Sequence, residues 1–457
     1  MLLQPYVKKN IALAWPLALN GLLMQSMLMI DTFLVSPLGE TPLAAMGIAT
    51  TIVAAILGIQ MALANGSQLV LSRAVGSGNN SALSKAFWAG LLINCAVASL
   101  FWLFLTLFDH NLIELLTDNR ALHQQINDYL SISKYIVLFT ALTQVMTSLF
   151  NSLGKTKVPF KGYLIELPIN ALLSYVLIHG YQSTGILYFE GIGVQGAALG
   201  SIIAITVRLL YLSLYLHLSP EVNITAPPTG KSMGRNIRQH FTEIFPIAAN
   251  VTILSIGVAM YQLLYAQLEI NAYVAITLVM PWIRAGMQVI AAWSHSSAIT
   301  ISQAIGSRKM DSLVRDVNTS IDIAVIISIL CACFFAVISL VIADIYPSLD
   351  EATYQALKAI APLYIFLPIV RGYNTVHGNV LRALGKTTAV FMINFTGQWI
   401  ISIPLCALII FVFDASIFWA FAIQPFEEIV KALPFRYLAR KSLKEFDMEK
   451  AEKLMYD

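Results

Sequence analysis

The sequence has little charge and few cysteines. Asp, Glu, Lys and Arg make up only 12% of the 457 residues, about half the share found in soluble domains. The four cysteines, Cys95, Cys331, Cys333 and Cys406, all lie in apolar runs, so no disulfide framework or zinc ribbon can be read from their spacing. A net charge of +3 gives no reason to expect a nucleic-acid partner. These shortages exclude an ordinary soluble enzyme.

Motifs for catalysis and nucleotide binding are also missing. There is no Gly-rich phosphate loop ending in Lys-Ser or Lys-Thr, so we do not expect ATP hydrolysis. The chain has neither an HExxH motif nor an aspartate-rich diphosphate motif. Cys331 and Cys333 lie in the middle of an apolar run without further candidate ligands. We therefore expect no enzyme activity, no bound metal and no cofactor.

Long apolar runs fill the chain instead. Hydrophobic residues make up 58% of the sequence, and the mean hydropathy is +0.73. A helix needs about 20 apolar residues to cross a bilayer, and continuous rather than alternating runs favour helices over a barrel. The predicted fold is an all-α polytopic membrane protein with twelve transmembrane helices. The expected spans are 11–36, 43–71, 84–108, 129–152, 158–180, 192–218, 240–266, 272–303, 319–343, 359–385, 388–413 and 415–438.

Lysine and arginine predict the orientation. With a cytoplasmic N-terminus, most of them fall in cytoplasmic loops, and the opposite loops hold only Arg120 and Lys358. Positive residues favour the cytoplasmic side, so we expect both termini there. The charged tail after Arg436 is expected to form a short surface helix. We expect a monomer in the inner (plasma) membrane of a bacterial cell, with the lipid bilayer as its surroundings.

The two halves of the chain resemble each other. Pro16 and Asn20 recur as Pro246 and Asn250, 230 residues later. Similar offsets relate Ser72, Ala74, Gly76 and Ser77 to Ser302, Ala304, Gly306 and Ser307, and Leu153–Thr156 to Leu384–Thr387. Such a repeat is typical of transporters with a central site and alternating access. We predict two pseudo-twofold-related six-helix lobes: an N-terminal lobe (1–218), a linker (219–239), a C-terminal lobe (240–438) and a cytoplasmic tail (439–457).

Polar residues form stripes on two predicted helices of the first half. Asn20 and Asp31 fall on one face of the first span, and Glu166, Asn170 and Ser174 recur at helical spacing in the fifth. A carboxyl group in an apolar site can bind and release a proton near neutral pH. We expect Asn20, Met27, Glu166 and Asn170 to bind substrate, and Pro16 and Pro168 to act as hinges. The alternatives are a helix-end capping role for Asp31 near Ser36 and a packing role for Glu166.

The second half supplies cations within its spans. Arg284 and Arg371 fall near the middle of their runs, and Glu427 and Glu428 lie in the last one. We expect these four residues to form a charge network, because an intramembrane charge usually has a partner or faces a cavity. Glu427 and Lys431 are also spaced to pair along their own helix. The alternative is a wall of arginines that binds an anion.

Several motifs resemble the multidrug and toxic compound extrusion (MATE) transporters. Asp31-Thr-Phe-Leu-Val-Ser-Pro resembles their first-span signature, with Ser36 in place of the usual glycine. The loop after the second span, the opening of the sixth and the exit of the tenth also resemble theirs; these segments are Leu71–Asn79, Gly193–Ser201 and Leu381–Thr387. With twelve spans and the half-repeat, the similarity covers nearly the whole chain.

The resemblance implies an antiporter that exports organic cations and other amphipathic compounds. The sodium-coupled branch of that family places acids where this chain has Leu254 and Arg371. The DinF-like branch places its acids in the first lobe, where Asp31 and Asn170 match and Ser174 replaces a second Asp. This comparison favours H⁺ over Na⁺ as the coupling ion, with Asp31 as the proton carrier. Its expected hydrogen-bonding partners are Asn170, Ser174 and Ser201.

Two alternatives remain open from the sequence. One is Na⁺-coupled drug antiport. The other is a flippase of the same superfamily that moves a lipid-linked or anionic lipid, in which Arg284 and Arg371 would contact the substrate.

Overall fold

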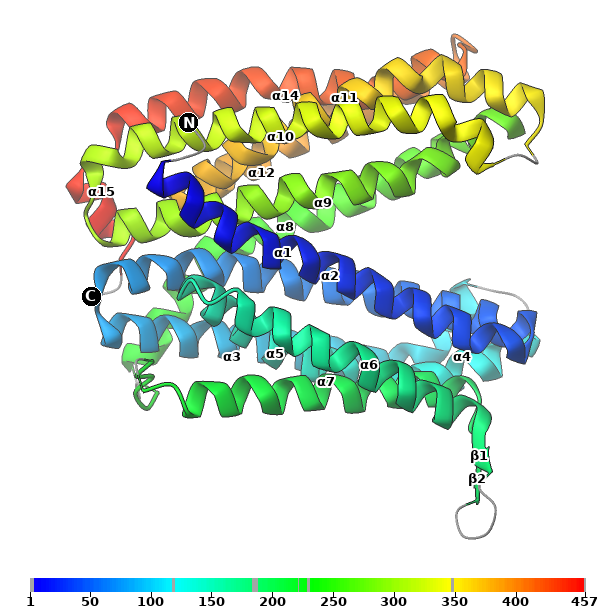
Figure 1. The fold of residues 1–457 in the computed structure, drawn as a ribbon, viewed down its shortest axis with the longest axis horizontal. Helices are drawn as coiled ribbons and strands as arrows, with labels where there is room; N and C mark the ends of the chain where they lie inside the picture. Colours follow the sequence, from blue (N-terminus) through cyan, green and yellow to red (C-terminus); the bar gives the residue numbers. More distant parts are fainter. Residues whose placement is uncertain are drawn as a thin grey trace. The chain divides into compact units, whose positions relative to one another are not determined.

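The computed structural model describes residues 4–116, 120–182, 188–220, 222–227, 231–346 and 349–455 (Figure 1). Within them the helices are α1 (Pro5–Val35), η1 (Ser36–Leu38), α2 (Glu40–Ser77), α3 (Asn80–Leu116), α4 (Arg120–Ser133), α5 (Ile136–Ser152), α6 (Lys157–His179), α7 (Val194–His217), α8 (Lys231–Tyr265), α9 (Ile270–Gly306), α10 (Met310–Ile345), α11 (Glu351–Ala383), α12 (Thr387–Phe395), η2 (Thr396–Ser402), α13 (Ile403–Phe411), α14 (Ile417–Glu445) and α15 (Met448–Lys453). The strands β1 (Gly180–Gln182) and β2 (Tyr188–Glu190) pair antiparallel, with Tyr181 opposite Phe189.

Membrane-length helices dominate, which confirms the all-α polytopic fold. Eleven helical segments in the described part of the chain are long and apolar enough to cross a bilayer, and α4 and α5 together form one of them. The twelfth is α14, whose 29 residues are long enough but include Glu427, Glu428 and Lys431 in the middle. The charged tail after Arg436 continues α14 to Glu445, and the short helix α15 follows.

The described chain forms two compact units. The N-terminal unit comprises Leu19–Ala248, and the C-terminal unit comprises Ala249–Met455 together with the residues up to Ala18. Both boundaries fall two residues after a helix-interior proline, Pro16 in α1 and Pro246 in α8. Packing thus divides the chain inside α1 and α8, whereas the lobes expected from the sequence meet at the 219–239 linker.

Side-chain contacts explain why the first turns of α1 belong to the C-terminal unit. Thr300 donates a hydrogen bond to Asn10 Oδ1 at 3.0 Å, and the Tyr6 and Ser320 hydroxyls lie 2.6 Å apart. The first turns of α8 are held in the N-terminal unit in a similar way. There His240 Nε2 lies 2.8 Å from Ser67 Oγ, and Arg73 forms an ion pair with Glu243.

Two glycines let α6 and α7 approach closely in the N-terminal unit. A Cβ on Gly196 would lie 2.5 Å from the carbonyl carbon of Leu177. A Cβ on Gly200 would lie 2.8 Å from the backbone nitrogen of Ser174. Small residues four apart are a common means of close helix packing in membranes. This contact fixes the spacing of the polar residues that α6 and α7 carry.

A π-helical segment interrupts the eleventh span of the C-terminal unit. The segment η2 (Thr396–Ser402) joins α12 to α13 and carries Gln398, whose side chain packs directly on Gly257 of α8. Single π turns inside α-helices are frequent at functional sites. In the same unit, Tyr265, Ile276, Phe335 and Phe421 belong to a buried apolar cluster.

We predict that Gly200→Val forces α6 and α7 apart and destabilises the protein by about 1–3 kcal/mol, as overpacking does elsewhere. The loss is measured as the drop in melting temperature of the purified protein in detergent. Size-exclusion chromatography after heating determines that temperature. Gly58→Val is the matched control, because a Cβ on Gly58 meets nothing within 4 Å. Equal melting temperatures for the two variants would contradict the close-packing account.

Candidate functional site

The N-terminal unit holds a cavity of about 310 Å³. Its wall combines polar side chains from α1, α2, α6 and α7 with apolar and methionine side chains. The lining residues are Met24, Met27, Asp31, Thr50, Thr51, Val53, Ala54, Leu57, Tyr129, Ile136, Glu166, Asn170, Ser201 and Ile205. Of the four residues expected to bind substrate, Met27, Glu166 and Asn170 line this cavity. Asn20 is buried but is not part of the lining.

Asp31 ends a short hydrogen-bond chain in this cavity. Asn170 Nδ2 donates to Ser201 Oγ at 2.9 Å, and Ser201 Oγ donates to Asp31 Oδ2 at 3.2 Å. Asp31 lies inside α1 and only 7% of its surface is exposed. Its Oδ1 has no hydrogen-bond partner among the described residues. The structure thus joins Asp31, Ser201 and Asn170 in one chain, with Ser174 close to the same carboxyl group, and Asp31 does not cap the helix end.

Ser174 is buried one turn beyond Asn170 on α6. Its hydroxyl faces Gly200 of α7, where a Cβ would lie 2.5 Å away. Ser174 Oγ makes no hydrogen bond within the described part of the chain, and the residue is not among those that line the cavity. Ser174 therefore lies in the α6–α7 contact and close to the Asp31 carboxyl group, and its part in proton handling stays a prediction.

A buried ion pair compensates the second carboxylate of the cavity. Arg208 Nη1 lies 2.7 Å from Glu166 Oε2, and both side chains are 4% exposed. Arg208 Nη2 donates to Thr143 Oγ1 at 2.9 Å, and the guanidinium carbon lies 4.2 Å from the centre of the Tyr163 ring. The sequence reasoning missed Arg208. The signal was available, because Arg208 follows Ser201 by seven residues and so lies on the same face of α7.

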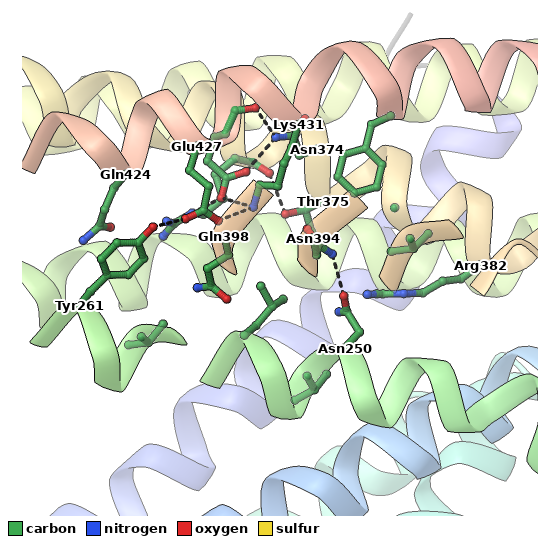
Figure 2. A pocket seen from close by; sticks show the side chains of 18 of the residues that line it. Asn250, Tyr261, Asn374, Thr375, Arg382, Asn394, Gln398, Gln424, Glu427 and Lys431 are labelled. Carbon is green, nitrogen blue, oxygen red and sulfur yellow. Dashed lines mark hydrogen bonds and ion pairs between the residues drawn. The ribbon is translucent and has the colours of Figure 1, made fainter. Parts of the chain in front are cut away.

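The C-terminal unit holds a second cavity, of about 330 Å³, with charges on its wall. Lys431 Nζ lies 2.8 Å from Glu427 Oε1 and 3.2 Å from Glu428 Oε1. Arg371 Nε lies 3.1 Å from Glu428 Oε1. Figure 2 shows Lys431 and Glu427 in this network. The expected pairing of Arg371 with the last span is present, as is the Glu427–Lys431 pair along α14.

Polar side chains that the sequence did not single out complete this network. Tyr261 donates to Glu427 Oε2 at 2.5 Å, and Asn374 Nδ2 donates to Glu428 Oε2 at 2.8 Å. Asn394 Nδ2 donates to Asn250 Oδ1 at 2.8 Å (Figure 2). These residues come from α8, α11 and α12, so no local spacing in the sequence connects them.

The expectation that Arg284 joins this charge network is wrong. Arg284 is exposed on α9, beside the buried Ile283, and does not line the cavity. It forms no hydrogen bond or ion pair with the charged residues of α11 and α14 that the structure describes. Its side chain lies on the face of α9 that is turned away from the core of the unit. Hydropathy alone cannot distinguish this outer face of the helix from the inner one.

The two prolines expected to act as hinges lie within continuous helices. Pro16 is inside α1, and Pro168 is inside α6, two residues from Glu166 and two from Asn170. Proline removes a backbone hydrogen bond and loosens a helix at that point. Their hinge role stays a prediction. Among the residues that the structure describes, no three His, Cys, Asp or Glu side chains are grouped to hold a metal ion.

Comparison with known proteins identifies related sequences and folds. A family model described as MatE matches residues 16–176 and 246–408, two segments that begin at the same offset as the internal repeat. The multidrug resistance protein MdtK of Yersinia pseudotuberculosis is 23% identical over 419 residues, which cover 88% of each chain. The probable multidrug resistance protein NorM of Rhizobium meliloti is 22% identical over 411 residues, covering 86% of this chain and 81% of NorM. A crystal structure of MATE in the bent conformation has a TM-score of 0.87 at 14% identity and covers 98% of each chain.

We predict that Arg208→Met destabilises the protein by about 3–5 kcal/mol, because it leaves the Glu166 carboxylate buried without a cation. The double variant Arg208→Met with Glu166→Gln should recover most of that loss, since it removes both charges together. Thermal melting of the purified proteins in detergent measures both effects. A double variant no more stable than the single one would show that Arg208 does not act by compensating Glu166.

Proposed function

This chain belongs to the MatE family of transporters, and from that premise we propose that it is a secondary active antiporter that exports organic cations and other amphipathic compounds in exchange for H⁺. The relatives named multidrug resistance proteins support this class of substrate. The cavity of the N-terminal unit is the proposed drug site. Its methionine, leucine, valine and isoleucine side chains suit varied apolar ligands, and Asp31 supplies a negative charge for a cation.

The observation that carries the proposal is that Asp31 is buried in the cavity wall and forms no ion pair with any cationic side chain that the structure describes. Glu166, the other carboxylate of the wall, is compensated by Arg208. An uncompensated carboxylate in an apolar site is stable when it is protonated or when it binds a cation. Proton and drug therefore compete for Asp31, which is the requirement for exchange of one against the other.

The proposed cycle follows from this competition. A proton from outside neutralises Asp31, the first helix bends near Pro16, and the drug leaves the cavity. On the cytoplasmic side, a new drug cation binds at Asp31 and releases the proton. Ser201 and Asn170 orient the carboxyl group in both states through their hydrogen bonds. We also propose an inner-membrane location with both termini in the cytoplasm.

The cavity of the C-terminal unit supports H⁺ over Na⁺ as the coupling ion. Leu254 and Arg371 lie in its wall at the positions where the sodium-coupled branch has acids. The carboxylates that are present, Glu427 and Glu428, are already bridged by the Lys431 ammonium group. Assignment to the DinF-like branch is part of the same proposal and depends on Asp31 and Asn170. The flippase alternative loses support, because Arg284 does not line this cavity and Arg371 is paired with Glu428.

We predict that Asp31→Asn abolishes drug/H⁺ exchange while the protein still folds, because an amide cannot carry the proton. In energised everted vesicles, ethidium should dissipate the pH gradient with the wild type and not with the variant, with or without Na⁺. Asp109→Asn, the same change outside the cavity, should leave exchange unchanged. Normal exchange by Asp31→Asn would contradict the proposal. Dissipation of the pH gradient only in the presence of Na⁺ would assign the coupling to sodium instead.

A further inference from the structure

The cavity of the C-terminal unit carries one positive charge more than its carboxylates can compensate. Arg371 and Lys431 are paired with Glu427 and Glu428, as described above. The third cation of the wall, Arg382, forms no ion pair with any described residue. Its Nη1 donates to Asn379 Oδ1 at 2.9 Å, and its Nε finds no acceptor in the described part of the chain.

Arg382 lies far from the acid pair along one face of α11. Arg371 and Arg382 are eleven residues apart, which places them within about 20° around the helix and about 16 Å along it. Gly378 lies between them on the cavity wall. A Cβ at that position would have its nearest neighbours, on Phe435 and Val390, 3.7 Å away. The space near Arg382 is therefore bordered by a residue without a side chain.

Unsatisfied amide groups line the same cavity. Asn250 Nδ2, Asn374 Oδ1 and Gln398 Oε1 have no hydrogen-bond partner among the described residues, and all three side chains are more than nine-tenths buried. Figure 2 shows the Arg382 guanidinium pointing toward Asn250. Buried polar atoms without partners cost free energy. A ligand with hydrogen-bonding groups would remove that cost.

We propose that this cavity is a second ligand site, which binds a small organic anion through Arg382. A guanidinium group binds a carboxylate in a planar, two-pronged arrangement. Asn250 Nδ2 is placed to donate to the same anion (Figure 2). The oxygens of Asn374 and Gln398 lie nearer the acid pair, where they can accept from polar groups at the other end of the ligand. The site is opposite in charge to the N-terminal cavity with Asp31, and the inference does not rest on the proposed drug export.

Binding of fluorescein, a dianion at pH 8, tests this site. The full-length protein is purified into phosphatidylcholine nanodiscs, and fluorescence anisotropy follows saturable binding. We expect Arg382→Gln to weaken binding at least tenfold, which is about 1.4 kcal/mol. Arg284→Gln is the matched control, since it removes an arginine of the same unit that lies outside the cavity. It should bind fluorescein as the wild type does.

A second variant keeps the test decisive if Arg382→Gln folds poorly. Gly378→Leu leaves every charge in place but fills the space beside Arg382, so it should also block fluorescein binding. Asp31→Asn should bind fluorescein normally, which separates this site from the proposed drug site. Absence of saturable binding by the wild type would overturn the proposal, as would wild-type affinity in both Arg382→Gln and Gly378→Leu.

Discussion

Compensation of charge inside the bilayer is the constraint on which the polar interior of this protein depends. An ionised side chain at mid-membrane costs about 2.5–3.5 kcal/mol on insertion scales unless it is paired or solvated. Arg208 meets this constraint for Glu166 in the N-terminal unit, and Lys431 and Arg371 meet it for the two glutamates of α14. Among the described charged residues that line the two cavities, Asp31 and Arg382 form no ion pair. These two unmatched charges are where a transported ion or solute can act.

The internal repeat shows that the two units carry different polar residues at matching positions. At the offset of 230 residues that relates Pro16 to Pro246, the counterpart of Asp31 is Tyr261. At the same offset the counterpart of Ser201 is Lys431. In the N-terminal unit these two positions hold a carboxylate, Asp31, and a hydroxyl, Ser201, which are hydrogen-bonded to each other. In the C-terminal unit they hold a phenol, Tyr261, and an ammonium group, Lys431, which both donate to Glu427. The backbone plan is shared, whereas the charges at matching positions are different. This difference supports the proposal that the N-terminal unit exchanges the proton.

Much of this organisation could be predicted from the sequence, for identifiable reasons. Hydropathy located the spans. The polar stripes and the family resemblance together predicted that Asp31, Asn170 and Ser201 share one site. The spacing from Ser201 places Arg208 on the polar face of α7, but the sequence does not show that this face meets Glu166 of another helix. Arg284 was assigned to the network wrongly because hydropathy does not say which face of α9 is buried. The sequence also could not show that packing divides α1 near Pro16, since Thr300 and Asn10 meet only through the tertiary fold. Long-range contacts, rather than local patterns, determined each of these outcomes.

The most direct test of the central claim is proton release on drug binding. The purified protein is placed in weakly buffered detergent solution at neutral pH, and a pH-sensitive dye follows the addition of ethidium. If drug and proton compete for Asp31, the wild type should release up to about one proton for each drug bound, and Asp31→Asn should release none. Proton release that persists undiminished in Asp31→Asn would contradict the account.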